Sequence, residues 1–131
     1  MTVVVAGVIE RDGRVLVCRR RPQDAHPRKW EFPGGKVEPG EAPWEALARE
    51  LHEELAIRVH AGREIERYEF RYPGKTPILL IFFSVSGFSG EPQNVVFETI
   101  AWAEPADLTA YDFLEGDIDF VGRLAEKKLL R

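Results

Sequence analysis

A run of carboxylates lies between Phe32 and Leu55, in the segment FPGGKVEPGEAPWEALARELHEEL. At about 3.6 residues per helical turn, Glu50, Glu53 and Glu54 would share one face of a helix. Like charges at this spacing repel, and the chain already has a formal net charge of −4, so the cluster costs stability unless a cation neutralises it. Magnesium prefers oxygen ligands and commonly bridges protein carboxylates and substrate phosphates. The segment therefore raises the hypothesis of a metal site.

Helical charge alone is not specific, because most glutamate clusters are solvated helix faces. The order of residues is more specific: Gly35, five residues, Glu41, seven residues, Arg49-Glu50-Leu51, one residue, Glu53-Glu54, then Ala56-Ile57. This order resembles the Nudix box. The chain is similar to MutT-type Nudix hydrolases over essentially its whole length, including the KWEFPGGK lead-in, the RDGRVLVCRRR segment and the AW pair before the last helix. One position departs, since the family has Gly where Ala56 follows the helix. A glycine there would serve the helix exit, so the departure bears on local stability more than on chemistry.

The resemblance implies Mg²⁺ as the cofactor, with Mn²⁺ able to substitute. It implies that Glu53, Glu54 and the Gly34 carbonyl bind the metal and that Arg49 holds the glutamates in place. Glu50 would be a metal ligand or the base that orients water. Glu98, in VFETIAW, would add a carboxylate from a loop facing the helix, although it could equally be a solvated loop residue. The general base is Glu50 or Glu98, and the sequence leaves both open.

Four further residues are candidate contacts to the nucleotide. Arg20 is the preferred phosphate or base contact, because alternation from Val15 and Val17 would turn one arginine inward across the sheet. Lys36 is a second cation close to the carboxylates in sequence. Phe32 could stack on a base or belong to the core. Asp117 stands at the start of the last helix, where such enzymes read the base, commonly with Asn, and it could also be an ordinary acid favoured by the helix dipole.

MutT-type enzymes split nucleoside triphosphates into a monophosphate and pyrophosphate. The best match is to enzymes that remove oxidised purine nucleotides such as 8-oxo-dGTP, a form of nucleotide-pool sanitation that serves DNA repair. An ionised Asp117 would only accept hydrogen bonds, and both the N7–H of an 8-oxopurine and the amine of cytosine would suit it. Hydrolysis of CTP or modified dCTP is therefore the leading alternative. A non-catalytic nucleotide-binding module is a third possibility, but such modules typically lack acids of the box, and Glu50, Glu53 and Glu54 are all present.

The elements that must position these residues can be read from the hydrophobic pattern. VVVAGVI and VLVC flank an RDGR turn and predict a hairpin; a run from about Ile57 and a run ending near Val85 flank a PGK turn and predict another. A short strand is expected at 100–102 and a helix at about 116–129, with one apolar stripe formed by Ile118, Val121, Leu124 and Ala125. In the Nudix-box helix, Trp44, Leu47, Ala48, Leu51 and Leu55 would form the packing stripe. The fold class is α/β (α+β), with a mixed sheet sandwiched between helices.

Composition limits the functions that remain. With 131 residues, of which 44% are hydrophobic, the chain has the size of one globular domain, and residues 1–131 are expected to form a single Nudix domain. The longest apolar run is too short to span a bilayer, and Cys18 is the only cysteine. The mild acidity argues against a duplex nucleic acid partner. We expect a cytoplasmic enzyme, monomer or homodimer, that binds a small nucleotide and neither membrane nor nucleic acid.

Overall fold

A computed structural model describes residues 1–126. Strands alternate with helices along the chain in the order β1 (Thr2–Arg11), β2 (Arg14–Arg19), β3 (Trp30–Glu31), β4 (Gly34–Lys36), α1 (Pro43–Leu55), β5 (Arg58–Phe70), β6 (Ile78–Ser89), β7 (Thr99–Ala103), the 3₁₀ helices η1 (Pro105–Ala110) and η2 (Glu115–Asp117), and α2 (Ile118–Ala125). Both predicted hairpins, the strand near 100–102 and the Nudix-box helix are confirmed. The short strands β3 and β4 were not predicted, and Phe32 lies between them.

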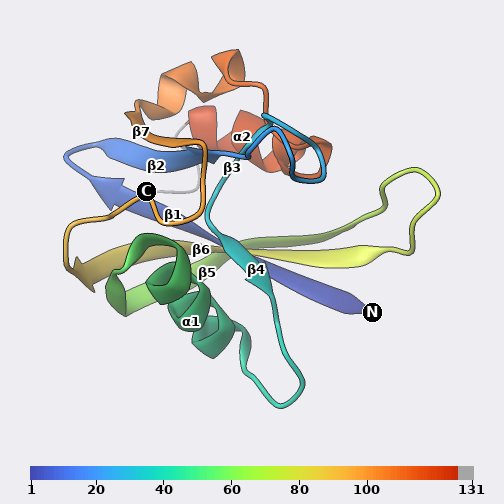
Figure 1. Cartoon of the computed structure of the whole chain (residues 1–131), viewed down its shortest axis with the longest axis horizontal. Coiled ribbons are helices and arrows are strands. Elements are labelled where there is room, and N and C mark those ends of the chain that lie inside the picture. Colours follow the sequence, from blue (N-terminus) through green and yellow to red (C-terminus); the bar gives the residue numbers. More distant parts are fainter. Residues whose placement is uncertain (127–131) are drawn as a thin grey trace.

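The sheet is mixed and β1 is at its centre (Figure 1). β1 runs parallel to β6, pairs antiparallel with β4 near its start, and pairs with β2 at its end. The turn from β1 to β2 uses Asp12 and Gly13, both at positive φ, which suits the tight loop of a twisted hairpin. β2 also pairs with β3 and β7. β1 therefore connects β6 and β5 on one side of the sheet with β2, β3 and β7 on the other.

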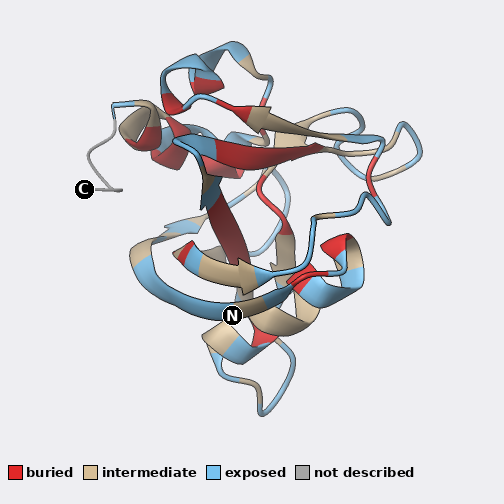
Figure 2. Cartoon of the chain, turned by 90° about the vertical axis from the view of Figure 1, so that its left-hand side faces the viewer, coloured by how far each residue is buried: buried red, intermediate tan, exposed pale blue. Residues whose placement is uncertain are grey.

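The side chains of β1 and β6 alternate between two apolar cores, one on each face of the sheet. Val5 and Ile9 of β1 pack with α1, whereas Ala6 and Val8 pack with α2. On the α2 side, the rings of Phe82 and Phe120 stack with centroids 3.9 Å apart. Figure 2 shows that the buried residues follow the sheet and the inner sides of the helices. The predicted α/β/α arrangement, helices on both faces of a mixed sheet, is confirmed.

The two helices differ in detail from the predicted ones. In α1 the buried residues are Ala46, Leu47, Leu51 and Leu55, while Trp44 and Ala48 are only half-buried. Pro43 occupies the first turn. The last helix begins at Ile118, because residues 115–117 form a separate 3₁₀ turn, and the predicted end at Leu129 lies outside the described residues. The predicted stripe was wrong for Ile118, which is 55% exposed; the buried stripe is Phe120, Val121 and Leu124.

Ala56 ends α1 in the left-handed conformation, with φ 58° and ψ 31°. Its N–H donates to the carbonyl of His52 at 3.0 Å, which satisfies one of the last free carbonyls of the helix. Ala56, which replaces the glycine of the family, therefore holds a left-handed backbone conformation that glycine adopts more easily than alanine. Within residues 1–126, no helix has the length and apolar character needed to cross a bilayer.

Candidate active site

Arg49 is the centre of the polar face of α1. Its Nε and Nη2 donate to the two carboxylate oxygens of Glu41 at 2.7 and 3.0 Å, and its Nη1 donates to Glu50 at 3.0 Å. A longer contact of 3.5 Å reaches Glu53. The hydrogen bonds from Arg49 are the main reason that the pKa of Glu41 falls to about 2. Nη2 also donates to the carbonyl of Lys36 at 3.1 Å, so Arg49 fastens α1 to β4.

Glu50 and Glu54 lie against the glycines of β4. The N–H of Gly34 donates to Oε1 of Glu54 at 3.1 Å. A Cβ added at Gly35 would lie 2.5 Å from Cδ of Glu50, so a side chain at this position would displace the Glu50 carboxylate. Burial, followed by the nearby charge of Glu50, raises the pKa of Glu54 to about 9. Two half-buried carboxyl groups that disfavour each other's negative charge in this way form a site that a cation would stabilise.

The other two predicted acids, Glu53 and Glu98, are more exposed to solvent than Glu50. The side chain of Glu53 is 57% exposed, against 17% for Glu50. Glu98 is held beside the end of β2, where its N–H donates to the carbonyl of Arg19 and its carboxylate lies 3.7 Å from Nε of Arg19. The segment before Glu98 docks on the end of α1, since the N–H of Val95 donates to the carbonyl of Glu54 at 3.2 Å.

The carboxylates fit a hard cation that shares its ligands with a substrate. In residues 1–126, no three His, Cys, Asp or Glu side chains are arranged to hold an ion by themselves. Glu50 and Glu54 supply oxygen donors beside the Gly34–Gly35 backbone, and Mg²⁺ usually takes only one or two carboxylates plus phosphate oxygens and water. When bound, such an ion would neutralise charge that develops on the phosphates and lower the pKa of a bound water.

A cavity of about 310 Å³ opens beside β4, on the side of the strand toward η2. Five of the predicted site residues line it: Arg20, Phe32, Gly34, Lys36 and Asp117. Arg20 lies just beyond the end of β2 and bonds through Nη1 to Oε1 of Glu31 at 2.9 Å and through Nε to the carbonyl of Ala25 at 2.6 Å. Phe32 is 2% exposed and packs edge-on against Phe120, so most of its ring belongs to the core.

Asp117 is a buried acid that lines this cavity. It is 6% exposed, and burial, with a smaller contribution from the charge of Glu31, raises its pKa to about 8. The carboxyl is therefore mostly protonated at pH 7, whereas the interpretation from sequence assumed an ionised group. Two tyrosines fix the preceding residue: the hydroxyl of Tyr68 donates to the carbonyl of Gly116 at 2.5 Å, and the N–H of Gly116 donates to the hydroxyl of Tyr72 at 3.2 Å.

The NUDIX domain family matches residues 1–124 of the chain. The chain is a Nudix hydrolase. It is 37% identical over 118 residues to the CTP pyrophosphohydrolase of Escherichia coli K12, which covers 90% of this chain and 87% of that protein. It is 34% identical over 122 residues to the 8-oxo-dGTP diphosphatase of the same organism, covering 92% of this chain and 94% of that protein. The solution structure of the E. coli ORF135 protein has a TM-score of 0.87 and 34% identity, covering all of this chain and 93% of that one. These matches confirm the MutT-like resemblance and the nucleotide-hydrolase class.

The Nudix hydrolase brings together some of its predicted residues and leaves others apart. Arg49, Glu50, Glu54 and the Gly34–Gly35 backbone meet between α1 and β4. Lys36 carries its side chain to the neighbouring cavity. Glu53 and Glu98 lie at the solvent-exposed edge of this group. Within residues 1–126, Glu98 makes an ion pair with Arg19 and no recorded contact with the acids of α1.

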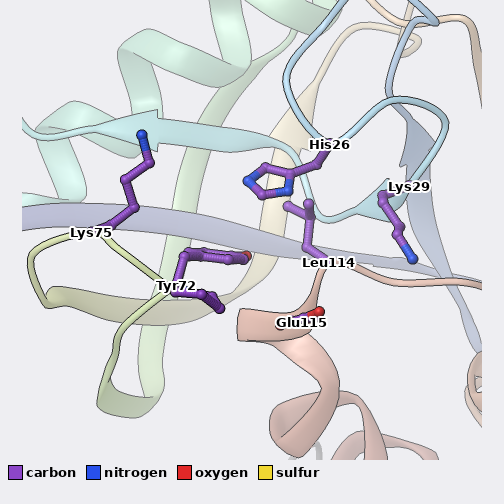
Figure 3. A pocket seen from close by; sticks show the side chains of 7 residues that line it. His26, Lys29, Tyr72, Lys75, Leu114 and Glu115 are labelled. Atoms are coloured by element: carbon purple, nitrogen blue, oxygen red, sulfur yellow. The ribbon is translucent and has the colours of Figure 1, made fainter.

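Three residues with polar side chains that line the cavity were missed: Glu31, His26 and Tyr72. An available signal for Glu31 was an acid between Trp30 and Phe32, in a stretch that otherwise reads as apolar. His26 and Tyr72 come from loops distant in sequence, and their ring centroids lie 4.8 Å apart. They also line an adjoining outer pocket of about 220 Å³, together with Lys29, Pro73, Lys75, Leu114 and Glu115 (Figure 3).

Proposed function

We propose that this Nudix hydrolase splits nucleoside triphosphates into a monophosphate and pyrophosphate with Mg²⁺, and that Mn²⁺ can substitute. The observation that carries the proposal is the position of two half-buried carboxylates, Glu50 and Glu54, against the glycines of β4, beside a cavity of about 310 Å³ that the buried Asp117 also lines. The phosphates would reach the helical carboxylates, and the base would enter the cavity toward Asp117. Arg20 and Lys36 supply positive charge along this path.

Each residue has a role in this proposal. Glu50, Glu53, Glu54 and the Gly34 carbonyl hold the ion together with phosphate oxygens, and Glu98 approaches from its loop. Glu50 or Glu98 takes a proton from the attacking water. Arg49 is a positioning residue, because its bonds to Glu41 and Glu50 and to the Lys36 carbonyl fix the helix against the strand. Phe32 forms the apolar floor of the cavity.

We propose 8-oxo-dGTP as the nucleotide, acting in sanitation of the nucleotide pool, because relatives of this name match over 92% of the chain. CTP is the second candidate, and the observation that favours it is the 37% identity to a CTP pyrophosphohydrolase. We further propose that residues 1–131 form a single Nudix domain and that the enzyme is cytoplasmic and acts as a monomer or homodimer.

The test is release of pyrophosphate from 8-oxo-dGTP, dGTP, CTP, 5-methyl-dCTP and ATP, with and without Mg²⁺. A kcat/KM for 8-oxo-dGTP well above that for dGTP supports the first candidate, and a preference for the cytidine nucleotides replaces it by the second. Binding of nucleotides without any Mg²⁺-dependent release of pyrophosphate would refute the enzymatic proposal and leave a nucleotide-binding module.

A further inference from the structure

Residues 90–98 connect β6 to β7 and cover the C-terminal end of α1. The N–H of Gln93 donates to the carbonyl of Leu55 at 2.8 Å. The N–H of Val95 donates to the carbonyl of Glu54 at 3.2 Å. The last carbonyls of a helix lack partners within the helix, so these two bonds satisfy groups that would otherwise need water. The start of the segment is therefore fastened to the helix that carries the acids.

The other end of this segment is fastened to β2 and to the core. The N–H of Glu98 donates to the carbonyl of Arg19 at 2.9 Å, and the Glu98 carboxylate lies 3.7 Å from Nε of the same arginine. Phe97 is buried in the core on the α1 side of the sheet. Val95 and Val96, between the two ends, are 50% and 37% exposed, so burial does not fix them. The middle of the segment therefore depends on hydrogen bonds for its conformation.

Asn94 closes this middle part with two hydrogen bonds to a single residue. Its Oδ1 accepts from the N–H of Phe97 at 2.8 Å, and its Nδ2 donates to the carbonyl of Phe97 at 2.9 Å. A side-chain amide can make both bonds because it has a donor and an acceptor, and short polar side chains commonly fix turns in this way. The two bonds set the path from the end of α1 to Phe97, and Glu98 is the next residue along the chain.

We propose that Asn94 is a positioning residue for Glu98, which fixes the Glu98 carboxylate relative to the acids of α1 so that they act on one substrate. This inference rests on the proposed function, because it requires Glu98 to take part in hydrolysis. Within residues 1–126, Glu98 makes no recorded contact with the acids of α1, so their side chains do not hold one another in place. The hydrogen bonds of the segment 90–98 do so instead. Because a misplacement of about 1 Å can cost about 10²-fold in rate, loss of these bonds should be visible in turnover.

The experiment is a double-mutant cycle of Asn94→Ala and Glu98→Gln. It measures kcat and KM for release of pyrophosphate from 8-oxo-dGTP or CTP, whichever the wild type hydrolyses faster. Asn94→Ala removes both bonds to Phe97 and leaves the Glu98 side chain intact, so kcat should fall by about 10- to 100-fold while KM changes by less than about twofold. Glu98→Gln should lower kcat at least as much, and adding Asn94→Ala to it should lower kcat no further, because the two residues act as one unit.

Two more variants separate positioning from a general loss of stability. Asn94→Ser keeps an acceptor for the N–H of Phe97 and should recover part of the lost kcat; it takes the place of Asn94→Ala in the cycle if that variant fails to fold. Gln93→Ala is the matched control, since Gln93 contributes only its backbone N–H to the bonds recorded within residues 1–126. It should retain the kcat and KM of the wild type.

Amide hydrogen exchange of the protein without metal or substrate tests the positioning independently of turnover. Asn94→Ala should speed exchange at the N–H groups of Val95, Phe97 and Glu98 by about tenfold or more, because the segment opens locally more often. Exchange within α1 should stay as in the wild type, and Gln93→Ala should exchange like the wild type throughout.

A wild-type kcat in Asn94→Ala would overturn the inference, as would a wild-type kcat in Glu98→Gln, effects of the two substitutions that multiply, or unchanged exchange at Val95, Phe97 and Glu98. In each of these cases, Mg²⁺-dependent release of pyrophosphate by the wild type leaves the proposed function standing. Absence of that release from the wild type would refute the proposed function, and this inference with it.

Discussion

Replacing Ala56 by Gly should stabilise the protein, because Ala56 holds a conformation that costs a residue with a Cβ free energy. The left-handed region costs such residues roughly 1–2 kcal/mol, and glycine avoids this penalty. Glycine also gives the unfolded chain more freedom, which offsets roughly 0.4–1 kcal/mol of the gain. Ala56 is exposed, so little packing is lost with its methyl group. The expected net gain in the free energy of unfolding is up to about 1 kcal/mol.

For a chain of 131 residues, 1 kcal/mol corresponds to a rise of roughly 3–4 °C in the midpoint of thermal unfolding. The assay is thermal and urea unfolding of Ala56→Gly, with Ala48→Gly in the middle of α1 as the control. The control should lose about 1 kcal/mol, because glycine weakens a helix interior. Activity should be unchanged in Ala56→Gly. If both variants lost stability to a similar extent, Ala56 would be part of the helix and the reasoning would be refuted.

The remaining predictions concern charge in the site. Glu53→Gln should lower turnover by about 10²- to 10⁴-fold while leaving the protein folded, and Glu45→Gln, on the exposed first turn, should retain activity; near-normal Mg²⁺-dependent turnover in Glu53→Gln would contradict the proposed site. Mg²⁺ should raise the thermal midpoint of the wild type and EDTA should reverse the rise, with a much smaller response in Glu54→Gln; equal responses would place the ion elsewhere. Asp117→Asn should be more stable than the wild type by a few kcal/mol at pH 8 but not at pH 3. In the unfolded chain Asp117 ionises near pH 3.8, in the folded protein only near pH 8, so its stabilising effect is lost as pH rises through this window. Urea unfolding at the two pH values measures this difference, and an equal gain at both would show that ionisation is not the cause.

The features that sequence predicts well are those set by neighbours along the chain. The stripe of Leu47, Leu51 and Leu55 follows from helical spacing, and the RDGR hairpin follows from a turn that requires positive φ at Asp12 and Gly13. Pro43 and the left-handed Ala56 mark the ends of α1 at the positions that local chemistry favours.

The features that sequence predicts poorly depend on contacts between distant segments. The bond from Gly34 to Glu54 exists because β4 pairs with β1 under α1, and no local pattern encodes this pairing. The protonated state of Asp117 depends on burial by several elements and on Glu31, 86 positions earlier, so an acid at a helix start was interpreted as ionised. The assignment of Ile118 to the buried stripe was wrong. η2 shifts the start of α2 to Ile118, and that side chain points outward.

The pairing of β4 with β1 has a consequence for how the chain can change in length. Only three residue pairs join the two strands: Val4 with Lys36, Val5 with Gly35, and Ala6 with Gly34. A shift of one residue would reverse every side chain, since neighbours in a strand point to opposite faces, and a shift that brought Lys36 to the place of Gly35 would also put a Cβ against Glu50. An insertion within 34–36 should therefore separate the carboxylates from the base cavity at once. The loop at 37–42 can vary in length only if Glu41 still reaches Arg49, because that ion pair fixes the loop relative to the helix. In a lineage that diversifies its substrates, we expect insertions to accumulate instead in the turns at 20–29 and 71–77, which border the cavity without setting the register of its walls.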